Sequence, residues 1–248
     1  MKLSQQAARR GYFLLKKVNQ AIRDYQMIDD GDRVAVAISG GKDSLGLLTL
    51  LDLRQQRVHQ RYEMIAVHVH GNASGLDCAG HTALADWLQA QDYSFVIEPM
   101  DLPPDEPLPL PCHRCTWHRR KTIFQVTDRL GCRVVAFAHN ADDLAQTTLL
   151  NLFYSGRLET MAPAANYFGG HFRLIRPLAF VPEKELARLA RACDFPPPPP
   201  KCPRADSSRR ALMAQALRLF HRDRDMVRTN LIRAALRNMN HRANTNQP

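Results

Sequence analysis

The chain has 248 residues, a formal net charge of +10 at pH 7, and no apolar run near the roughly 20 residues that a membrane span requires. Its length allows a full α/β core, and its first six residues lack the apolar segment of a secretory signal. Six cysteines in a chain without that signal indicate metal or thiol chemistry rather than a disulfide framework. We therefore expect a cytoplasmic protein that does not enter a membrane.

The positive charge lies mainly at the two ends of the chain. Residues 201–242 contain eleven Lys or Arg against three Asp, and residues 1–30 contain six against three. Such ends favour contacts with the phosphate backbone of a nucleic acid, although a solvated helical surface would have the same composition. We expect a basic helix within residues 1–30, an α/β domain over residues 31–195, and a proline-rich linker with a basic helical region over residues 196–248.

The first clear element is a buried strand at residues 34–38, which runs into a glycine turn and then an apolar helix at residues 45–53. The turn reads Ser39-Gly40-Gly41-Lys42-Asp43-Ser44. Its glycines let backbone N–H groups face a ligand, and the helix behind it adds partial positive charge. With the Lys42 ammonium and two hydroxyls, this turn predicts a polyphosphate site, and the Asp43 carboxylate implies Mg²⁺ beside it.

The same turn excludes two common phosphate loops. A Walker A loop would need glycine where Val36 stands and Ser or Thr where Asp43 stands, and the Rossmann pattern G-x-G-x-x-G is missing. The run matches instead, at every fixed position, the SGGxDS loop that it resembles in PP-loop ATP pyrophosphatases. In that superfamily the loop holds the β and γ phosphates of ATP while the α phosphorus is attacked. The alternative interpretation of these residues is an ordinary glycine turn between a strand and a helix.

The elements that follow predict a doubly wound, mainly parallel sheet. A strand at 62–69, a helix at 78–91 and a strand at 94–98 continue the alternation, and residues 4–25 have helical spacing. Such sheets bind ligands beyond the carboxyl ends of their strands, so the phosphate turn should share a crevice with the end of the strand at 62–69, around Val67, His68 and Val69. Adenine would lie against the backbone there in the superfamily.

A further predicted strand, at residues 134–138, also ends in a polar turn before a helix. His139 begins this turn, and Asp142 and Asp143 lie in the first turn of the helix. The two carboxylates could simply cap the helix and complement its dipole. Placed side by side at the ligand-binding edge of the sheet, they favour a metal or ligand contact.

A loop with five prolines, residues 102–111, leads to a C-x-x-C pair, Cys112 and Cys115. Such a pair is a redox dithiol, half of a zinc site or part of an iron–sulfur site, and spacing alone leaves these open. Cys202, after another proline run, is the other cysteine in a similar setting. We expect Cys78, Cys132 and Cys193 to be small buried apolar residues.

The order of these motifs resembles the tRNA 2-thiocytidine synthetase family of PP-loop enzymes. The shared features are the SGGKDS turn, the C-x-x-C pair followed by basic residues, H-x-x-D-D-x-x-Q-T, residues 151–156, Arg176-Pro177-Leu178 and the proline-rich segment around Cys202. The resemblance implies that ATP adenylates the C2 oxygen of a cytidine in the tRNA anticodon loop, expected at position 32. Sulfur then replaces that oxygen to give 2-thiocytidine, with release of pyrophosphate and AMP.

The resemblance also assigns cofactors and partners. It implies a [4Fe-4S] cluster on Cys112, Cys115 and Cys202, with an open iron for sulfide that a cysteine desulfurase or free sulfide supplies, and it is compatible with a homodimer. We expect catalytic roles for Asp43, Asp142 and the three cysteines, and Mg²⁺ on Asp43, Asp142 and Asp143. The expected ATP-binding residues are Ser39, Gly40, Gly41, Lys42, Asp43, Ser44, Val67, His68 and His139. The expected tRNA-binding residues are Arg119, Arg120, Lys121, Arg209 and Arg210.

Two other functions stay open from the sequence. One is another PP-loop reaction on tRNA, of the 2-thiouridine or lysidine type, which needs no set of three thiolates. The other is a zinc-stabilised RNA-binding module without catalysis.

Overall fold

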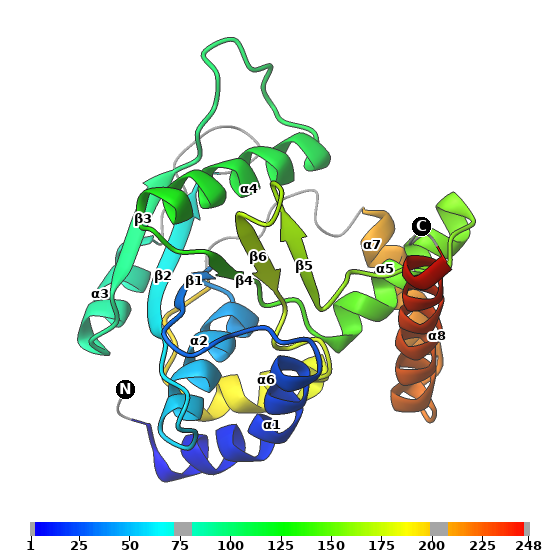
Figure 1. Ribbon diagram of the computed structural model, residues 1–248, viewed down its shortest axis with the longest axis horizontal. Coiled ribbons are helices and arrows are strands. Elements are labelled where there is room, and N and C mark those ends of the chain that lie inside the picture. The colour runs from blue at the N-terminus through cyan, green and yellow to red at the C-terminus, as the bar shows by residue number, and fades with distance from the viewer. Residues whose placement is uncertain (1–2, 72–80, 199–207, 246–248) are drawn as a thin grey trace.

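The computed structural model describes residues 3–71, 81–198 and 208–245, so Cys78 and Cys202 lie outside the described residues. Six strands form one sheet in the order β3-β2-β1-β4-β6-β5 (Figure 1). Their bounds are β1 Arg33–Ala37, β2 Glu63–His70, β3 Phe95–Pro99, β4 Val134–Ala136, β5 Ala164–Tyr167 and β6 Phe172–Ile175. Only the β5–β6 pair is antiparallel. This confirms the doubly wound, mainly parallel fold.

Strand β1 is buried on both faces because its residues alternate between two apolar layers. Val34 and Val36 belong to an apolar cluster that also contains side chains from α1 (Gln5–Asp24), α2 (Lys42–Gln55), α3 (His81–Ala90) and α6 (Glu183–Ala192). Ala35 faces the other layer, where it meets Val126 of α4 (Cys112–Arg129). Figure 1 shows α4 across the sheet from α1, α2 and α6. Two helical layers thus sandwich the sheet.

The C-terminal helices form a separate group at the β5 side of the sheet. Helices α7 (Arg209–Leu219) and α8 (Arg224–Thr245) pack on α5 (Ala141–Ser155) through a small apolar cluster that contains Leu144, Leu217 and Ile232 (Figure 1). Within the described ranges, no helix combines the length and the apolar character needed to cross a membrane.

Two details differ from the sequence expectations. The helix after the phosphate turn begins at Lys42 rather than at residue 45, and the β5–β6 hairpin was not predicted. The proline-rich loop ends at the start of α4, so Cys112 opens that helix and Arg119 lies in its interior. The boundaries of the three predicted chain regions stay a prediction.

Candidate active site

The phosphate turn connects β1 to α2 and is held by its own hydroxyls. The Ser39 N–H donates to Ser44 Oγ at 3.1 Å, and Ser44 Oγ donates to the Gly41 carbonyl at 2.9 Å. Gly40 has φ +78°, a left-handed conformation that favours glycine. The turn is therefore preformed by residues that the motif itself supplies.

Two of the helices that begin at this edge of the sheet, α5 and α2, have different N-termini. The start of α5 is capped, because the Asn140 side chain accepts from the Asp142 and Asp143 N–H groups and Asp143 accepts from the Asn140 N–H. The start of α2 has Gly41 at the N-cap and no side-chain cap. The Ser44 N–H donates to the Gly41 carbonyl at 3.1 Å, and the N–H groups before it are left for another acceptor, which makes α2 the anion-binding helix.

A cavity of about 300 Å³ lies between this turn and α4. The phosphate turn and the carboxyl ends of three strands form one side of it, and α4 and α7 form the other. Its lining residues are Ala37, Ile38, Ser39, Asp43, Ser44, Val69, Arg119, Ile123, Phe137, Ala138, His139, Asp143 and Arg210. The phosphate turn, which contains Asp43, and the second polar turn, which leads to Asp143, therefore line the same cavity.

Asp43 and Asp143 are the two carboxylates in this cavity, and their environment fits a divalent cation. Asp43 Oδ2 lies 3.0 Å from Lys42 Nζ, while Asp43 Oδ1 is buried with no hydrogen-bond partner among the described residues. Burial raises the pKa of Asp43, partly offset by Lys42, and the charge of Asp143 raises it further. Burial likewise raises the pKa of Asp143. A cation with oxygen preference would relieve both effects.

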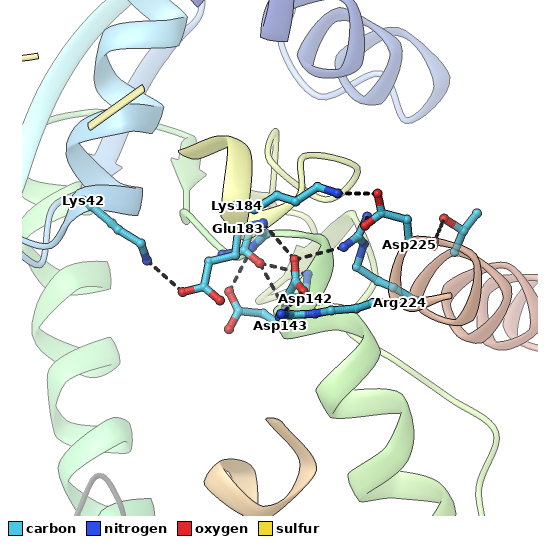
Figure 2. Close-up of polar contacts among 10 residues, drawn as sticks. Lys42, Asp142, Asp143, Glu183, Lys184, Arg224 and Asp225 are labelled. Carbon is cyan, nitrogen blue, oxygen red and sulfur yellow. Dashed lines mark hydrogen bonds and ion pairs between the residues drawn. The ribbon is translucent and has the colours of Figure 1, made fainter. Parts of the chain in front are cut away.

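Asp142 points elsewhere, although it is adjacent to Asp143 in the sequence. It is 2% exposed, and its two oxygens accept from Arg224 Nη2 at 3.0 Å and from the Glu183 N–H at 2.8 Å (Figure 2). Arg228, also buried, lies 3.5 Å from the same carboxylate. In this arrangement Asp142 joins α5 to α6 and α8, and only Asp143 reaches the cavity.

Lys42 makes a contact that sequence reasoning missed. Its Nζ donates to Asp43 Oδ2 at 3.0 Å. It also donates to Glu183 Oε1 at 3.0 Å, a contact that Figure 2 shows. Burial by itself would lower the pKa of Lys42, but the two carboxylates raise it above its usual value, so the ammonium stays charged. Glu183 is the first residue of α6, and nothing in its local sequence signals a partner 141 residues away.

The two histidines near the cavity are both held neutral by burial. Burial lowers the pKa of His139 to about 3, with Arg176, Arg210 and Arg120 adding to the effect, and its ring stacks on Phe137. Burial also lowers the pKa of His68, whose Nδ1 lies 2.7 Å from the Ile38 carbonyl. His139 lines the cavity, whereas His68 packs beneath it.

Val67 lies inside the sheet rather than at the cavity. Its carbonyl accepts from the Ile38 N–H at 2.8 Å, and its side chain is fully buried. Val69, two residues further along β2, is the residue of that strand that lines the cavity.

The two cysteines of the C-x-x-C pair lie in the first turn of α4. Cys112 is exposed, and Cys115 is half-buried against an apolar cluster that includes Val69 and Ile123. Successive steps of three and four residues place Cys112, Cys115, Arg119 and Ile123 on one helix face. Because Arg119 and Ile123 line the cavity, both thiols extend the cavity wall towards the start of α4.

The five basic residues predicted to bind RNA have different surroundings. Arg119 donates to the Gly71 carbonyl at 2.6 Å, the Arg120 guanidinium lies 6.0 Å from the Phe137 ring, and Lys121 pairs with Asp101 at 2.7 Å. Arg209 stacks over Tyr154, and Arg210 lies inside the cavity, 3.9 Å from Asp143. Only Arg119 and Arg210 of these five line the phosphate cavity.

The sheet order, the turn after β1 and the two carboxylates define an α/β nucleotide-binding protein of the PP-loop class. A family model described as a PP-loop domain matches residues 14–195. The U34-tRNA thiolase NcsA from Methanococcus maripaludis, solved with its [4Fe-4S] cluster, has a TM-score of 0.77 over 93% of this chain and 80% of its own. Its sequence identity is 23%, so the likeness concerns the fold.

Similarity to curated proteins narrows the class. The tRNA-cytidine(32) 2-sulfurtransferase of Citrifermentans bemidjiense is 33% identical over 226 residues, which is 88% of this chain and 87% of that protein. The same enzyme of Paracidovorax citrulli is 37% identical over 188 residues, or 74% of this chain. The chain belongs to the tRNA-cytidine(32) 2-sulfurtransferase family of PP-loop proteins, as the motifs indicated. It spans 60% of the Paracidovorax citrulli protein and 66% of the Delftia acidovorans one.

Proposed function

We propose that this chain catalyses ATP-dependent thiolation of a cytidine, expected at position 32, in the anticodon loop of tRNA. Its relatives are tRNA-cytidine(32) 2-sulfurtransferases, which supports this substrate. The observation that carries the proposal is the cavity itself. It brings the phosphate turn, two carboxylates and the thiol-bearing face of α4 together.

ATP would place its phosphates on the turn from Ser39 to Ser44, at the uncapped start of α2. Lys42 and Arg210 are the cations available to neutralise them, and Asp43 with Asp143 would hold Mg²⁺. His139 and Val69 line the part of the cavity beyond the turn, where the nucleoside of ATP would lie. A neutral imidazole there can accept or donate a hydrogen bond without adding charge.

The reaction needs two displacements. In the first, the C2 oxygen of the cytidine attacks the α phosphorus, and pyrophosphate leaves. The open N–H groups of α2 and the nearby cations stabilise the charge that builds up on the phosphates. In the second, sulfide attacks the activated carbon, and AMP leaves with the former C2 oxygen. The target base must leave its stack to reach the cavity, as single-stranded loops allow.

Cys112, Cys115 and Cys202 are the residues that would hold a [4Fe-4S] cluster. The exposed thiol of Cys112 and the half-buried one of Cys115 fit such a group, because they lie one turn apart on the face that continues the cavity. When bound, the cluster would supply an iron with an open position for sulfide. A cysteine desulfurase or free sulfide is the proposed sulfur source, the cytoplasm the proposed compartment, and a homodimer the proposed assembly.

The deciding experiment is mass spectrometry of tRNA nucleosides from cells that lack this protein. We expect 2-thiocytidine to disappear and to return when the wild-type gene is restored. An unchanged thionucleoside profile would overturn the proposal, and loss of 2-thiouridine instead would favour the other PP-loop chemistry. Stoichiometric zinc in the purified protein, with no pyrophosphate released from ATP and tRNA, would favour the non-catalytic RNA-binding module.

A further inference from the structure

A cavity larger than the phosphate site lies between α1 and α6. Figure 1 shows these two helices on the face of the sheet opposite α4. It has a volume of about 430 Å³, and a smaller hollow of about 150 Å³ continues it along α6. Together they are lined by Gln6, Arg9, Arg10, Phe13, Leu14, Glu185, Arg188, Arg191 and Ala192. We call this surface the α1–α6 groove.

The groove carries more positive charge than its own residues neutralise. It contains four arginines and one carboxylate, Glu185, which accepts from Arg188 at 2.6 Å. Within the described ranges, Arg9, Arg10 and Arg191 form no ion pair. Unneutralised cations gathered from two helices favour a polyanionic ligand.

Phe13 makes a nucleic acid a better ligand than a small phosphate compound. Its ring is 75% exposed although it lines the cavity among the arginines. An exposed ring beside guanidinium groups is a surface on which a base or a sugar can stack while the cations hold the phosphates.

The groove lies within reach of the proposed active site, because α6 connects the two. Glu183, at the start of α6, contacts Lys42 of the phosphate turn. Arg188 and Arg191 follow about 8 Å and 12 Å along the same helix. A strand of a nucleic-acid helix covers that distance in about four nucleotides, at roughly 3.4 Å for each charge.

We propose that the α1–α6 groove binds the phosphate backbone of the RNA substrate, outside the nucleotide that reacts. Arg9, Arg10, Arg188 and Arg191 hold phosphates, and Phe13 stacks on an exposed base or sugar. The identity of this RNA as tRNA rests on the proposed function. The assignment of the groove as a binding surface for a polyanion depends only on the positions of the four arginines and of Phe13.

The test compares binding of a labelled tRNA transcript to the full-length wild-type protein and to the double variant Arg9→Gln/Arg10→Gln, by fluorescence anisotropy over a salt series. The slope of log affinity against log salt should fall by about two in the variant, since each phosphate contact contributes about one. The matched control is Arg129→Gln/Arg133→Gln. It removes two exposed arginines that line neither the groove nor the phosphate cavity: Arg129, which ends α4 and pairs with Glu98, and Arg133, which precedes β4. This control should keep the wild-type slope, and ATP affinity should be the same in all three proteins.

A second variant tests the stacking role separately. Phe13→Ala should weaken tRNA binding on the order of tenfold without changing the salt slope. An equal loss of slope in both double variants would overturn the proposal, since it would show only an effect of net charge. Retention on anionic phospholipid vesicles, with tRNA binding unchanged by the substitutions, would overturn it too and assign the groove to a membrane surface.

The outcomes separate the two proposals. Wild-type protein that binds tRNA through the groove but produces no 2-thiocytidine would leave the groove standing and remove the proposed function. Normal thiolation together with an unaltered salt slope in Arg9→Gln/Arg10→Gln would leave the proposed function standing and remove the groove as an RNA-binding surface. A wild-type protein that does not bind tRNA would overturn both.

Discussion

Asp43 combines two properties that conflict unless a cation is present. Its Oδ1 is buried with no hydrogen-bond partner in the part of the chain that the structure describes, and burial raises its pKa. The ligand-free fold therefore holds a carboxylate that is less stable as an anion than it would be in the unfolded chain. A residue kept in such a position is one whose charge serves a ligand rather than the fold.

This conflict predicts the behaviour of Asp43→Asn. A raised pKa in the folded state contributes stability that is present below the unfolded value of 3.8 and is lost as pH rises through the folded value. Without ligands, the variant should therefore be as stable as wild type at pH 7, or more stable. It should lose the rise in melting temperature that Mg²⁺ and ATP give the wild type, and AMP formation should fall by about two orders of magnitude. Thermal unfolding with and without Mg²⁺ and ATP, and an AMP assay, measure these effects.

Asp86→Asn is the control for this substitution, because Asp86 is an exposed residue of α3 outside the cavity. It should keep both the ligand-induced shift and the activity. A wild-type response to Mg²⁺ and ATP in Asp43→Asn would show that the cation is held elsewhere.

At the scale of elements, the start of α5 divides two neighbouring carboxylates between two tasks. Asp143 faces the cavity, while Asp142 holds α8 through Arg224, as Figure 2 shows, and through Arg228. Removing one partner of a buried ion pair leaves the other charges uncompensated, which costs about 3–5 kcal/mol. Asp142→Ala should therefore lower the free energy of unfolding by that amount in urea titrations.

Asp225→Asn is the matched control for the Asp142 prediction. Asp225 pairs with Lys184 and Arg228, but its side chain is 58% exposed, so its loss should cost less than about 1 kcal/mol. If Asp142→Ala instead keeps its stability and loses Mg²⁺-dependent ATP cleavage, Asp142 is a cation ligand, as the sequence had suggested.

The elements that the sequence predicted well are those whose periodicity and turn chemistry agree. The apolar run from Val34 and the glycine turn after it predicted β1, the phosphate turn and a helix after the turn, which the structure confirms, although α2 begins at Lys42 rather than at residue 45. The β5–β6 hairpin was missed because its strands have four residues each, too few for a clear alternation. Short strands depend on their partners in the sheet, which the local sequence does not reveal.

The site was predictable as a set of motifs but not as a set of contacts. The two strand-to-helix turns predicted that Asp43 and the Asp142–Asp143 pair lie at one edge of the sheet, because the carboxyl ends of parallel strands meet there. It could not tell which of Asp142 and Asp143 faces the cavity, since both lie in the same helical turn. It also could not show the Glu183–Lys42 pair, which joins residues that are distant in the sequence.

At the scale of the whole molecule, the proposed cluster site joins two regions that are distant along the chain. Cys112 and Cys115 open α4 beside the cavity, whereas Cys202 precedes α7, the helix that brings Arg210 into the same cavity. This connection makes Cys202 the informative position. It tests whether the segment before α7 supplies a ligand that α4 does not.

Cys202→Ala should lose the cluster and the thiolation activity while ATP binding stays near the wild-type value, because the phosphate turn does not depend on the thiol. The control is Cys193→Ala. Burial raises the pKa of the Cys193 thiol to about 11, so this thiol stays protonated and is a poor iron ligand. Iron and acid-labile sulfide per chain, measured after anaerobic purification, should fall in the first variant only. Full iron content in Cys202→Ala would remove Cys202 from the ligand set and leave the sulfur step to thiols on α4 alone.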